Sequence, residues 1–433
     1  MRRLLVVLMC TVLLINAMPV MAQVPGPGSP YNSAFTIQNL ESKDGTCVYT
    51  LYGADGSPAF TSTSTTIQAN GSIFVYVGNL GMNSGLYSVV ISCDVNVVAV
   101  SNYTGSGGAY AASYAGVTAA QTASTVYFPG LYKNYYGYYS NVVVQNASNT
   151  SVNVTLKIYR GATLVDSETK AVPANAPVVF DQKDRTALPD GIYAGVVEAT
   201  GPVAAMVNIW NNAGEQFAYS GFTSGSSVVY APVLMKFYYG FRTALTVQNM
   251  GDADVTVRVT YSNGVTNTQT IPARASQLFY TPNEPGLPNG WLGSAKIETI
   301  SGTGPIVGLV NEADDKRRAA SYTCFASGST ESYAPIVLKR YYGYSSSITC
   351  QNIGTESTNI AVTFSNGVVE TRNNIAPNGT ALFYQPNNAS LPNGFNGSAM
   401  ITAAQPIVCI INQNQVENPA VQDFLLAYEG IVR

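Results

Sequence analysis

Three tyrosine-rich segments carry the side chains of this chain that are best suited to hold a ligand. Each has a lysine followed by two adjacent tyrosines and a glycine: Lys133, Tyr135 and Tyr136; Lys236, Tyr238 and Tyr239; Lys339, Tyr341 and Tyr342. Tyrosine joins a large apolar ring to a polar hydroxyl, so it suits both the stacking of sugar rings and packing at a protein junction. The sequence leaves two interpretations open, a polysaccharide-binding patch and a packing surface between domains.

A single dense charge cluster, residues 312–318, offers the one plausible group of metal ligands. Glu312, Asp314 and Asp315 supply oxygens of the kind that Ca²⁺ prefers. The adjoining basic residues balance these acids, and the corresponding positions 211–214 of a related segment are neutral. We therefore expect a solvated loop, with no metal and no cofactor.

Catalytic groups are sparse. The chain has no histidine, which excludes an imidazole-based catalytic triad and a His-type metal site. A pair of carboxylates could serve a glycosidase. However, Glu198 and Glu298 align with the neutral Thr402, so no such pair recurs across the related segments. We expect a protein that is not an enzyme.

The tyrosine-rich segments belong to a tandem repeat. Pro129, Pro232 and Pro335 are 103 residues apart, and such a constant spacing indicates tandem domains of one fold. A divergent first copy begins near residues 34–39, which match residues 244–249 of the third copy but have no Tyr-Tyr-Gly segment before them. The expected organisation is a signal peptide at 1–22, a Pro/Gly lead at 23–30, and repeats at 31–122, 123–225, 226–328 and 329–433.

The first 22 residues have the pattern of a secretory signal peptide. A charged start precedes an apolar run over residues 4–15, and Ala22 ends a stretch with small residues suited to cleavage. No later apolar run is long enough to cross a membrane, since a span needs roughly 20 such residues. We expect an exported chain with no membrane span after cleavage.

Within each repeat, short alternating segments predict β-strands. Val255, Val257 and Val259 alternate with polar residues, and residues 305–311 are apolar on both parities, as expected for a strand buried on both faces. Seven or eight such strands a repeat, separated by turns, predict an antiparallel β-sandwich. The fold class is therefore all-β: four tandem antiparallel β-sandwiches in a rod.

The runs 271–280 and 293–298 resemble immunoglobulin-like repeats of bacterial secreted and cell-surface proteins. The resemblance covers the three later repeats well and the first loosely. Such repeats serve as stalks, adhesins and envelope layers, so the resemblance implies location and architecture and carries over no catalytic residue.

Five cysteines follow the expected cleavage site. Cys47 and Cys93 lie in apolar alternating segments of the first repeat and are expected to form a disulfide in an oxidising compartment. Cys350 and Cys409, in the fourth repeat, have the separation of the bridged strands of an immunoglobulin sandwich, and either a bridge or two buried thiols fits them. Cys324 stands where the other repeats have glycine, and its state is left open.

Composition points to an exported surface more than to a nucleic-acid partner. Only 10% of the residues are charged and the net charge is −3, which gives no concentrated basic surface. Low charge also favours assembly. We expect a secreted or cell-surface protein with a structural or adhesive role, self-assembling end to end, whose partners are itself or other envelope components. The alternative is a secreted protein that binds polysaccharide through its tyrosine patches.

Overall fold

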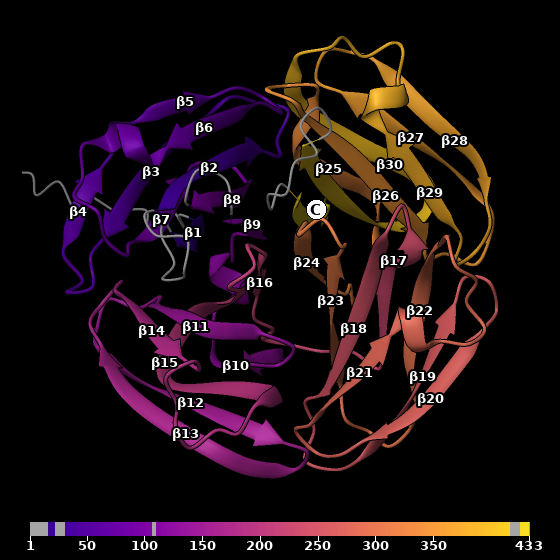
Figure 1. The fold of residues 1–433 in the computed structure, drawn as a ribbon. Helices are drawn as coiled ribbons and strands as arrows, with labels where there is room; N and C mark the ends of the chain where they lie inside the picture. The colour runs from indigo at the N-terminus through magenta and orange to yellow at the C-terminus, as the bar shows by residue number, and fades with distance from the viewer. Residues whose placement is uncertain (1–15, 22–30, 106–109, 416–424, 433) are drawn as a thin grey trace, which may run out of the picture.

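The computed structural model describes residues 16–21, 31–105, 110–415 and 425–432 (Figure 1). The charged start and the apolar run of the expected signal peptide, its cleavage site and the Pro/Gly lead lie outside these residues. The described chain is all-β, with five antiparallel sheets, short 3₁₀ turns and no α-helix. The strands fall into four consecutive sets, here called units 1 to 4.

Units 1 and 2 have the following elements. Unit 1 comprises β1 (Asn16–Met21), β2 (Tyr31–Asn39), β3 (Gly45–Tyr52), β4 (Pro58–Thr61), β5 (Thr65–Ile67), β6 (Ser72–Tyr76), η1 (Val77–Leu80), β7 (Ser88–Cys93), β8 (Val97–Gly105) and β9 (Tyr110–Ala115), and η3 (Ala119–Gln121) follows it. Unit 2 comprises β10 (Ala123–Lys133), β11 (Tyr138–Asn146), β12 (Val152–Arg160), β13 (Thr163–Val172), β14 (Pro177–Asp181), β15 (Gly191–Asn211) and β16 (Gln216–Ser220).

Units 3 and 4 repeat this order. Unit 3 comprises β17 (Val228–Tyr238), β18 (Phe241–Asn249), β19 (Val255–Tyr261), β20 (Thr266–Ile271), β21 (Ser276–Tyr280), η4 (Thr281–Asn283), β22 (Trp291–Ser301), β23 (Ile306–Ala313) and β24 (Ala319–Thr323). Unit 4 comprises β25 (Ser329–Lys339), β26 (Tyr344–Asn352), β27 (Thr358–Phe364), β28 (Val369–Ile375), β29 (Thr380–Tyr384), η5 (Gln385–Asn387), β30 (Phe395–Gln415), β31 (Leu425–Glu429) and β32 (Ile431–Val432).

Each unit has two layers that share one core. In unit 3 the outer layer has the order β17-β22-β19-β20 and the inner layer β21-β18-β23-β24. Val255, Val257 and Val259 of β19 are buried while the residues between them are partly exposed, and residues 306–310 of β23 are all buried. The alternating strand and the strand buried on both faces, both predicted from the sequence, are therefore confirmed.

The four units close into a ring, which corrects the expected rod (Figure 1). The inner-edge strands β9, β16, β24 and β31 lie around its axis, each in contact with the next and β31 with β9. Tyr333 and Ile431 of unit 4 pack against the core of unit 1, and Val100 of unit 1 packs into the core of unit 4. In the inner layer of unit 3, β23 is buried on both faces, and the buried Gln248 of β18 donates to the carbonyl of Gly195, so unit 3 buries its second face against unit 2.

Unit 1 differs from the others in its first strand. β1 pairs with β7 from Asn16↔Cys93 to Met21↔Ser88, which is the place that β10, β17 and β25 hold against β15, β22 and β30. β1 lies within the stretch expected to be removed as a signal peptide. Cleavage after Ala22 would therefore take this strand away from β7.

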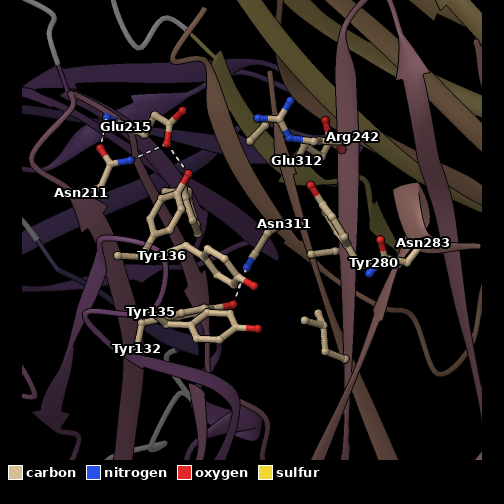
Figure 2. A pocket seen from close by; sticks show the side chains of 15 residues that line it. Tyr132, Tyr135, Tyr136, Asn211, Glu215, Arg242, Tyr280, Asn283, Asn311 and Glu312 are labelled. Atoms are coloured by element: carbon tan, nitrogen blue, oxygen red, sulfur yellow. Dashed lines mark hydrogen bonds between the residues drawn. The ribbon is translucent and has the colours of Figure 1, made fainter. Parts of the chain in front are cut away.

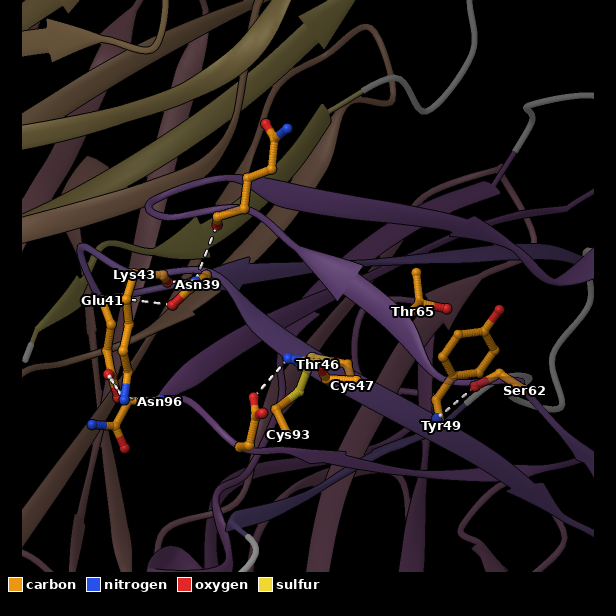
Figure 3. The surroundings of a disulfide bond; sticks show 12 residues. Asn39, Glu41, Lys43, Thr46, Cys47, Tyr49, Ser62, Thr65, Cys93 and Asn96 are labelled. Atoms are coloured by element: carbon orange, nitrogen blue, oxygen red, sulfur yellow. Dashed lines mark hydrogen bonds and ion pairs between the residues drawn. A yellow bond between two sulfur atoms is a disulfide. The ribbon is translucent and has the colours of Figure 1, made fainter.

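The expected Cys47–Cys93 disulfide is present, and Cys350 and Cys409, which the sequence left open, are bridged as well. Cys47 is bonded to Cys93 and Cys350 to Cys409, and Figure 3 shows the first between neighbouring strands. Each joins directly paired residues of one sheet, β3 with β7 and β26 with β30. The comparison of Cys350 and Cys409 with an immunoglobulin bridge is therefore wrong in geometry, because that bridge joins opposite sheets.

A tyrosine hydroxyl holds the bulge that each repeated proline creates. The pairing of β17 with β22 shifts register between Ala231 and Leu234, around Pro232. Tyr322 of β24 donates its hydroxyl hydrogen to the carbonyl of Val233 and accepts the N–H of the same residue at 3.1 Å. Corresponding contacts join Tyr219 to Gly130 and Tyr428 to Ile336. One hydroxyl thus satisfies two buried backbone groups that the bulge removes from the ladder.

The asparagine at the end of β2, β11, β18 and β26 locks a turn in each of the four units. The Asn249 amide donates to the carbonyls of Ala253, Ile271 and Pro272 at 2.8, 3.1 and 3.1 Å, and its oxygen accepts the N–H of Gly251. Asn39, Asn146 and Asn352 tie the matching turn in their own units. The divergent first copy therefore keeps the same turn-locking device.

The free thiol Cys324 is explained by a pair of small residues near the ring axis. A backbone hydrogen bond joins each pair: Gly116 to Ala99, Gly221 to Ala205, Cys324 to Gly308, and Gly430 to Cys409. Each pair has one glycine, but in unit 3 the glycine stands at the opposite position. A Cβ added at Gly308 would lie 2.7 Å from the Cys324 sulfur. Cys324 thus fills the space that Gly308 leaves.

We expect the two positions of unit 3 to be energetically coupled. Gly308→Ala should lower the free energy of unfolding by about 1–3 kcal/mol through overpacking. Adding Cys324→Gly should restore much of it, since the double variant has the Ala–Gly arrangement of unit 2. Urea unfolding of both single variants and the double variant measures the coupling. Simply additive losses would contradict this account.

Candidate functional site

The tyrosine-rich segments form hairpin tips of unusual backbone geometry. Tyr136 and Gly137 have φ of 50° and 83°, and Tyr239 and Tyr342 have φ of 48° and 47°, each followed by a glycine of positive φ. Two consecutive residues of positive φ make a type I′ hairpin turn, which favours Asn, Asp or Gly at both places. A tyrosine there is strained by about 1–2 kcal/mol. A tyrosine of positive φ recurs at this place in units 2, 3 and 4, and the tips of units 3 and 4 hold a second residue of positive φ, Phe237 and Arg340.

The two tyrosines of each tip have different surroundings. The second is mostly exposed: 84% for Tyr136, 83% for Tyr239 and 83% for Tyr342. The first is half-buried and receives the second ring edge-on, with centroids 4.7 Å apart for Tyr135 and Tyr136. The same contact recurs between Tyr238 and Tyr239 and between Tyr341 and Tyr342. The predicted patches are thus part packing surface and part free surface.

The lysines of these patches point elsewhere. The Lys236 ammonium is buried and donates to the carbonyl of Glu284 at 2.7 Å. Lys339 donates to the carbonyls of Asn388 and Leu391, and Lys133 to that of Arg185. All three therefore anchor a loop of their own unit.

A cavity of about 570 Å³ lies beside the first tip, between units 2 and 3 (Figure 2). Unit 2 contributes aromatic side chains from the Tyr136 hairpin and Phe217 of β16, while unit 3 contributes Arg242, Tyr280 and Asn283. The junction is fixed by a hydrogen bond of 2.8 Å from the Asn311 amide to the Tyr132 hydroxyl. This size and a lining that combines aromatic rings with a few polar groups are typical of small-molecule sites.

The polar groups of the cavity come from both units. Glu215 is 8% exposed and its Oε2 accepts hydrogen bonds from the Tyr138 hydroxyl and, at 2.6 Å, from the Asn211 amide (Figure 2). Burial raises the pKa of Glu215 above its usual value. Arg242 of unit 3 pairs with the exposed Asp315 at 2.5 Å. A carboxylate and a guanidinium thus lie at opposite sides of a tyrosine-lined space.

The junction between units 3 and 4 also lies beside a Tyr-Tyr-Gly hairpin tip, but it has different charged side chains. Phe241 stands where unit 2 has Tyr138, and Arg318 where unit 2 has Glu215. The Arg318 guanidinium lies 4.6 Å from the centre of the Phe241 ring and pairs with Asp314 at 2.5 Å. The repeated hairpin therefore meets an acidic partner at one junction and a basic partner at the next.

The three acids of the 312–318 cluster do not converge. Asp314 pairs with Arg318 and Asp315 with Arg242. Glu312 is buried and accepts a hydrogen bond of 2.8 Å from the Asn412 amide, and burial raises its pKa to about 8. Among the described residues, no group of three or more Cys, Asp or Glu side chains is arranged to hold a metal ion.

A second cavity of about 740 Å³ opens on the ring axis, with all four units contributing to its wall. Its acidic member is Glu429, whose Oε1 accepts the N–H and, at 2.7 Å, the hydroxyl of Thr323. Burial raises the pKa of Glu429 and that of the neighbouring Cys324 thiol. These contacts tie unit 4 to unit 3.

Comparison with known proteins supports no assignment of family or function. No protein-family model and no curated protein matches the chain. A crystal structure described as Thermotoga maritima 1070 is 11% identical, covering 24% of this chain and 95% of that chain, with a TM-score of 0.22. Escherichia coli alpha-2-macroglobulin activated by porcine elastase is 10% identical over 95% of this chain and 44% of that chain, with a TM-score of 0.12. The FN1–FN3 domains of chicken CNTN1 are 11% identical over 67% of this chain and 97% of that chain, with a TM-score of 0.08. Similarities at these TM-scores support no argument about function.

The described chain contains no helix long and apolar enough to cross a membrane.

Glu215, Arg242 and Tyr280 were not singled out from the sequence. A signal was present for Tyr280, because the run Phe-Tyr-Thr-Pro-Asn at 279–283 returns as Phe-Tyr-Gln-Pro-Asn at 383–387. Glu215 and Arg242 lie at positions where the other units have different residues, so the repeat gave no sign of them.

Proposed function

We propose that this chain is an exported, non-catalytic protein of the cell surface, with a structural or adhesive role. Its four units would be immunoglobulin-like β-sandwich domains spanning 31–122, 123–225, 226–328 and 329–433. The two disulfides are compatible with an extracellular protein. Other envelope components are the expected partners.

The observation that carries this proposal is the strained, exposed tyrosine that recurs at three hairpin tips. Asparagine or glycine would relieve the turn, and an exposed aromatic ring adds little to the core. Strain that persists at the surface commonly marks a functional position. We infer that Tyr136, Tyr239 and Tyr342 are the contact points of an adhesive surface.

End-to-end assembly has less support from this architecture. The prediction of end-to-end assembly assumed a rod whose two terminal units each lack one neighbour, so that these free ends could contact another molecule. In the ring, unit 4 makes that contact with unit 1. Adhesion through the tips needs no such assembly.

Polysaccharide binding remains the second candidate. It is favoured by the cavity beside Tyr136, where aromatic rings lie next to the side chains of Glu215, Arg242 and Asn283. Aromatic faces stack on sugar rings, and these polar groups suit hydroxyl recognition.

We expect the triple variant Tyr136→Asn, Tyr239→Asn and Tyr342→Asn to lose adhesion while keeping its fold. The better turn geometry and the lost ring contact should nearly offset, at about 1 kcal/mol a site each. Pull-down on purified polysaccharides and on whole cell envelopes, with a thermal melt alongside, measures both effects. Phe74→Asn is the matched control, since Phe74 is 68% exposed and lies outside the tips. Undiminished retention of the triple variant on both materials would disprove the role of the tips.

A further inference from the structure

The cavity between units 2 and 3 has walls suited to a particular charge. Six aromatic rings line it, those of Tyr132, Tyr135, Tyr136, Tyr138, Phe217 and Tyr280. The faces of such rings attract cations, most strongly where water is excluded. We propose that this cavity binds the ammonium group of an organic cation, such as an amino sugar. As an amino-sugar site, it rests on the proposed surface function and names the ligand class of the same tip.

A carboxylate is built into this aromatic wall. The Asn211 side-chain oxygen accepts the backbone N–H groups of Ala213 and Glu215 at 3.0 and 3.1 Å, which closes a tight loop under Glu215. The Asn211 amide and the Tyr138 hydroxyl both donate to Oε2 of Glu215. They fix the carboxylate on the cavity wall, as Figure 2 shows, and leave Oε1 able to accept a hydrogen bond from a ligand.

The cationic side chain of the cavity is largely balanced. Arg242 would repel an ammonium group, but Asp315 pairs with it at 2.5 Å. Asp314, which adds negative charge near Glu215, is paired with Arg318. Glu312 also lines the cavity, but burial raises its pKa to about 8, so it is mostly uncharged at neutral pH. The described charges around the cavity therefore leave Glu215 in excess, and the site favours a cation over an anion.

The junction between units 3 and 4 provides an internal comparison. It keeps the tip, with Tyr238 and Tyr239, but places the Arg318 guanidinium over Phe241, where unit 2 has Glu215 and Tyr138. A guanidinium already faces the aromatic ring there, so a second cation would be repelled. A variant of that tip is a matched control for the first.

The binding of a permanent cation should depend on pH in one direction. Tyr138, Arg242 and Asp314 are the titratable or charged groups that act on Glu215, and burial raises its pKa above the usual carboxyl range. Only the ionised carboxylate attracts the cation. Affinity should therefore decline as the pH falls through this pKa, and it should rise further as Glu312, which also lines the cavity, ionises near pH 8.

Isothermal titration of the full mature chain with choline, whose charge does not change with pH, tests the proposal. Glu215→Gln should weaken binding at least about fivefold, which corresponds to about 1 kcal/mol. Arg242→Gln should strengthen binding, because it removes the opposing charge, and Tyr239→Asn at the next junction should leave it unchanged. Opposite signs for Glu215 and Arg242 are the result expected of a cation site and not of simple stacking.

Sugar probes separate this inference from the function on which it rests. Glucosamine should bind and its neutral N-acetyl form should bind much more weakly. Equal binding of the two sugars, no choline binding, or choline binding insensitive to Glu215→Gln would each overturn the cation site. Choline binding with the expected pattern, in a protein that adheres to no envelope or polysaccharide, would uphold the site and refute the surface function. Tyr280→Leu removes an aromatic ring and no charge, and it should also weaken choline binding. It is the second test variant if Glu215→Gln does not fold.

Discussion

Replacing Cys47 and Cys93 by serine is expected to lower the free energy of unfolding of the protein by about 4 kcal/mol. The bridge closes a loop with a sequence separation of 46, and a loop of this length loses roughly that much chain entropy when unfolded. Loss of the Cys350–Cys409 bridge, with a separation of 59, should have a similar effect. Urea unfolding of the mature protein measures both losses.

The control for this experiment is a chain in which Cys324 is the one cysteine left after the signal peptide. Reductant should shift the unfolding midpoint of the native protein and leave that of the control unchanged. Mass spectrometry of unreduced protein should find the peptides of Cys47 and Cys93 linked. Recovery of both as free thiols, or equal midpoints with and without reductant, would rule the bridge out.

The second large effect is expected from Tyr322→Phe, which removes one oxygen atom. That hydroxyl satisfies both the N–H and the carbonyl of Val233 in the bulge beside Pro232. Each buried group left without a partner costs about 1–3 kcal/mol, so the variant should lose about 2–4 kcal/mol. Tyr239→Phe, in the same unit but at an 83% exposed position, should change stability by less than about 0.5 kcal/mol. A thermal or urea melt compares the two, and equal stability would contradict the clamp.

The strands were predictable because their signals are local. The alternation of Val255, Val257 and Val259 places them on one face of β19, and the doubly apolar run at 305–311 forms the twice-buried β23. Such patterns depend only on residues a few positions apart.

The ring was not predictable from the repeat. A repeat of 103 residues specifies a unit and shows that each unit can contact the next, but the rotation between neighbours decides whether the array extends or closes. That rotation depends on contacts such as Asn311 with Tyr132 and Asn412 with Glu312. These residues lie 179 and 100 positions apart, and no pattern in the sequence connects them.

The candidate site was predictable only in part, for the same reason. The tyrosines were found because they recur, yet the sequence did not separate the packed Tyr135 from the exposed Tyr136. Their backbone strain depends on turn type, which the unusual residue at that position concealed. Glu215 and Arg242 meet across a junction, so the cavity they share exists only after the units are placed.

The contact between units 4 and 1 also changes how the molecule can lose its structure. In an open array of repeats the terminal units have one neighbour each and fray first. Here every unit packs against two others, so detaching any of them must break two interfaces at once. Melting is therefore expected to be one concerted event, with protection from hydrogen exchange similar across the inner strands β9, β16, β24 and β31.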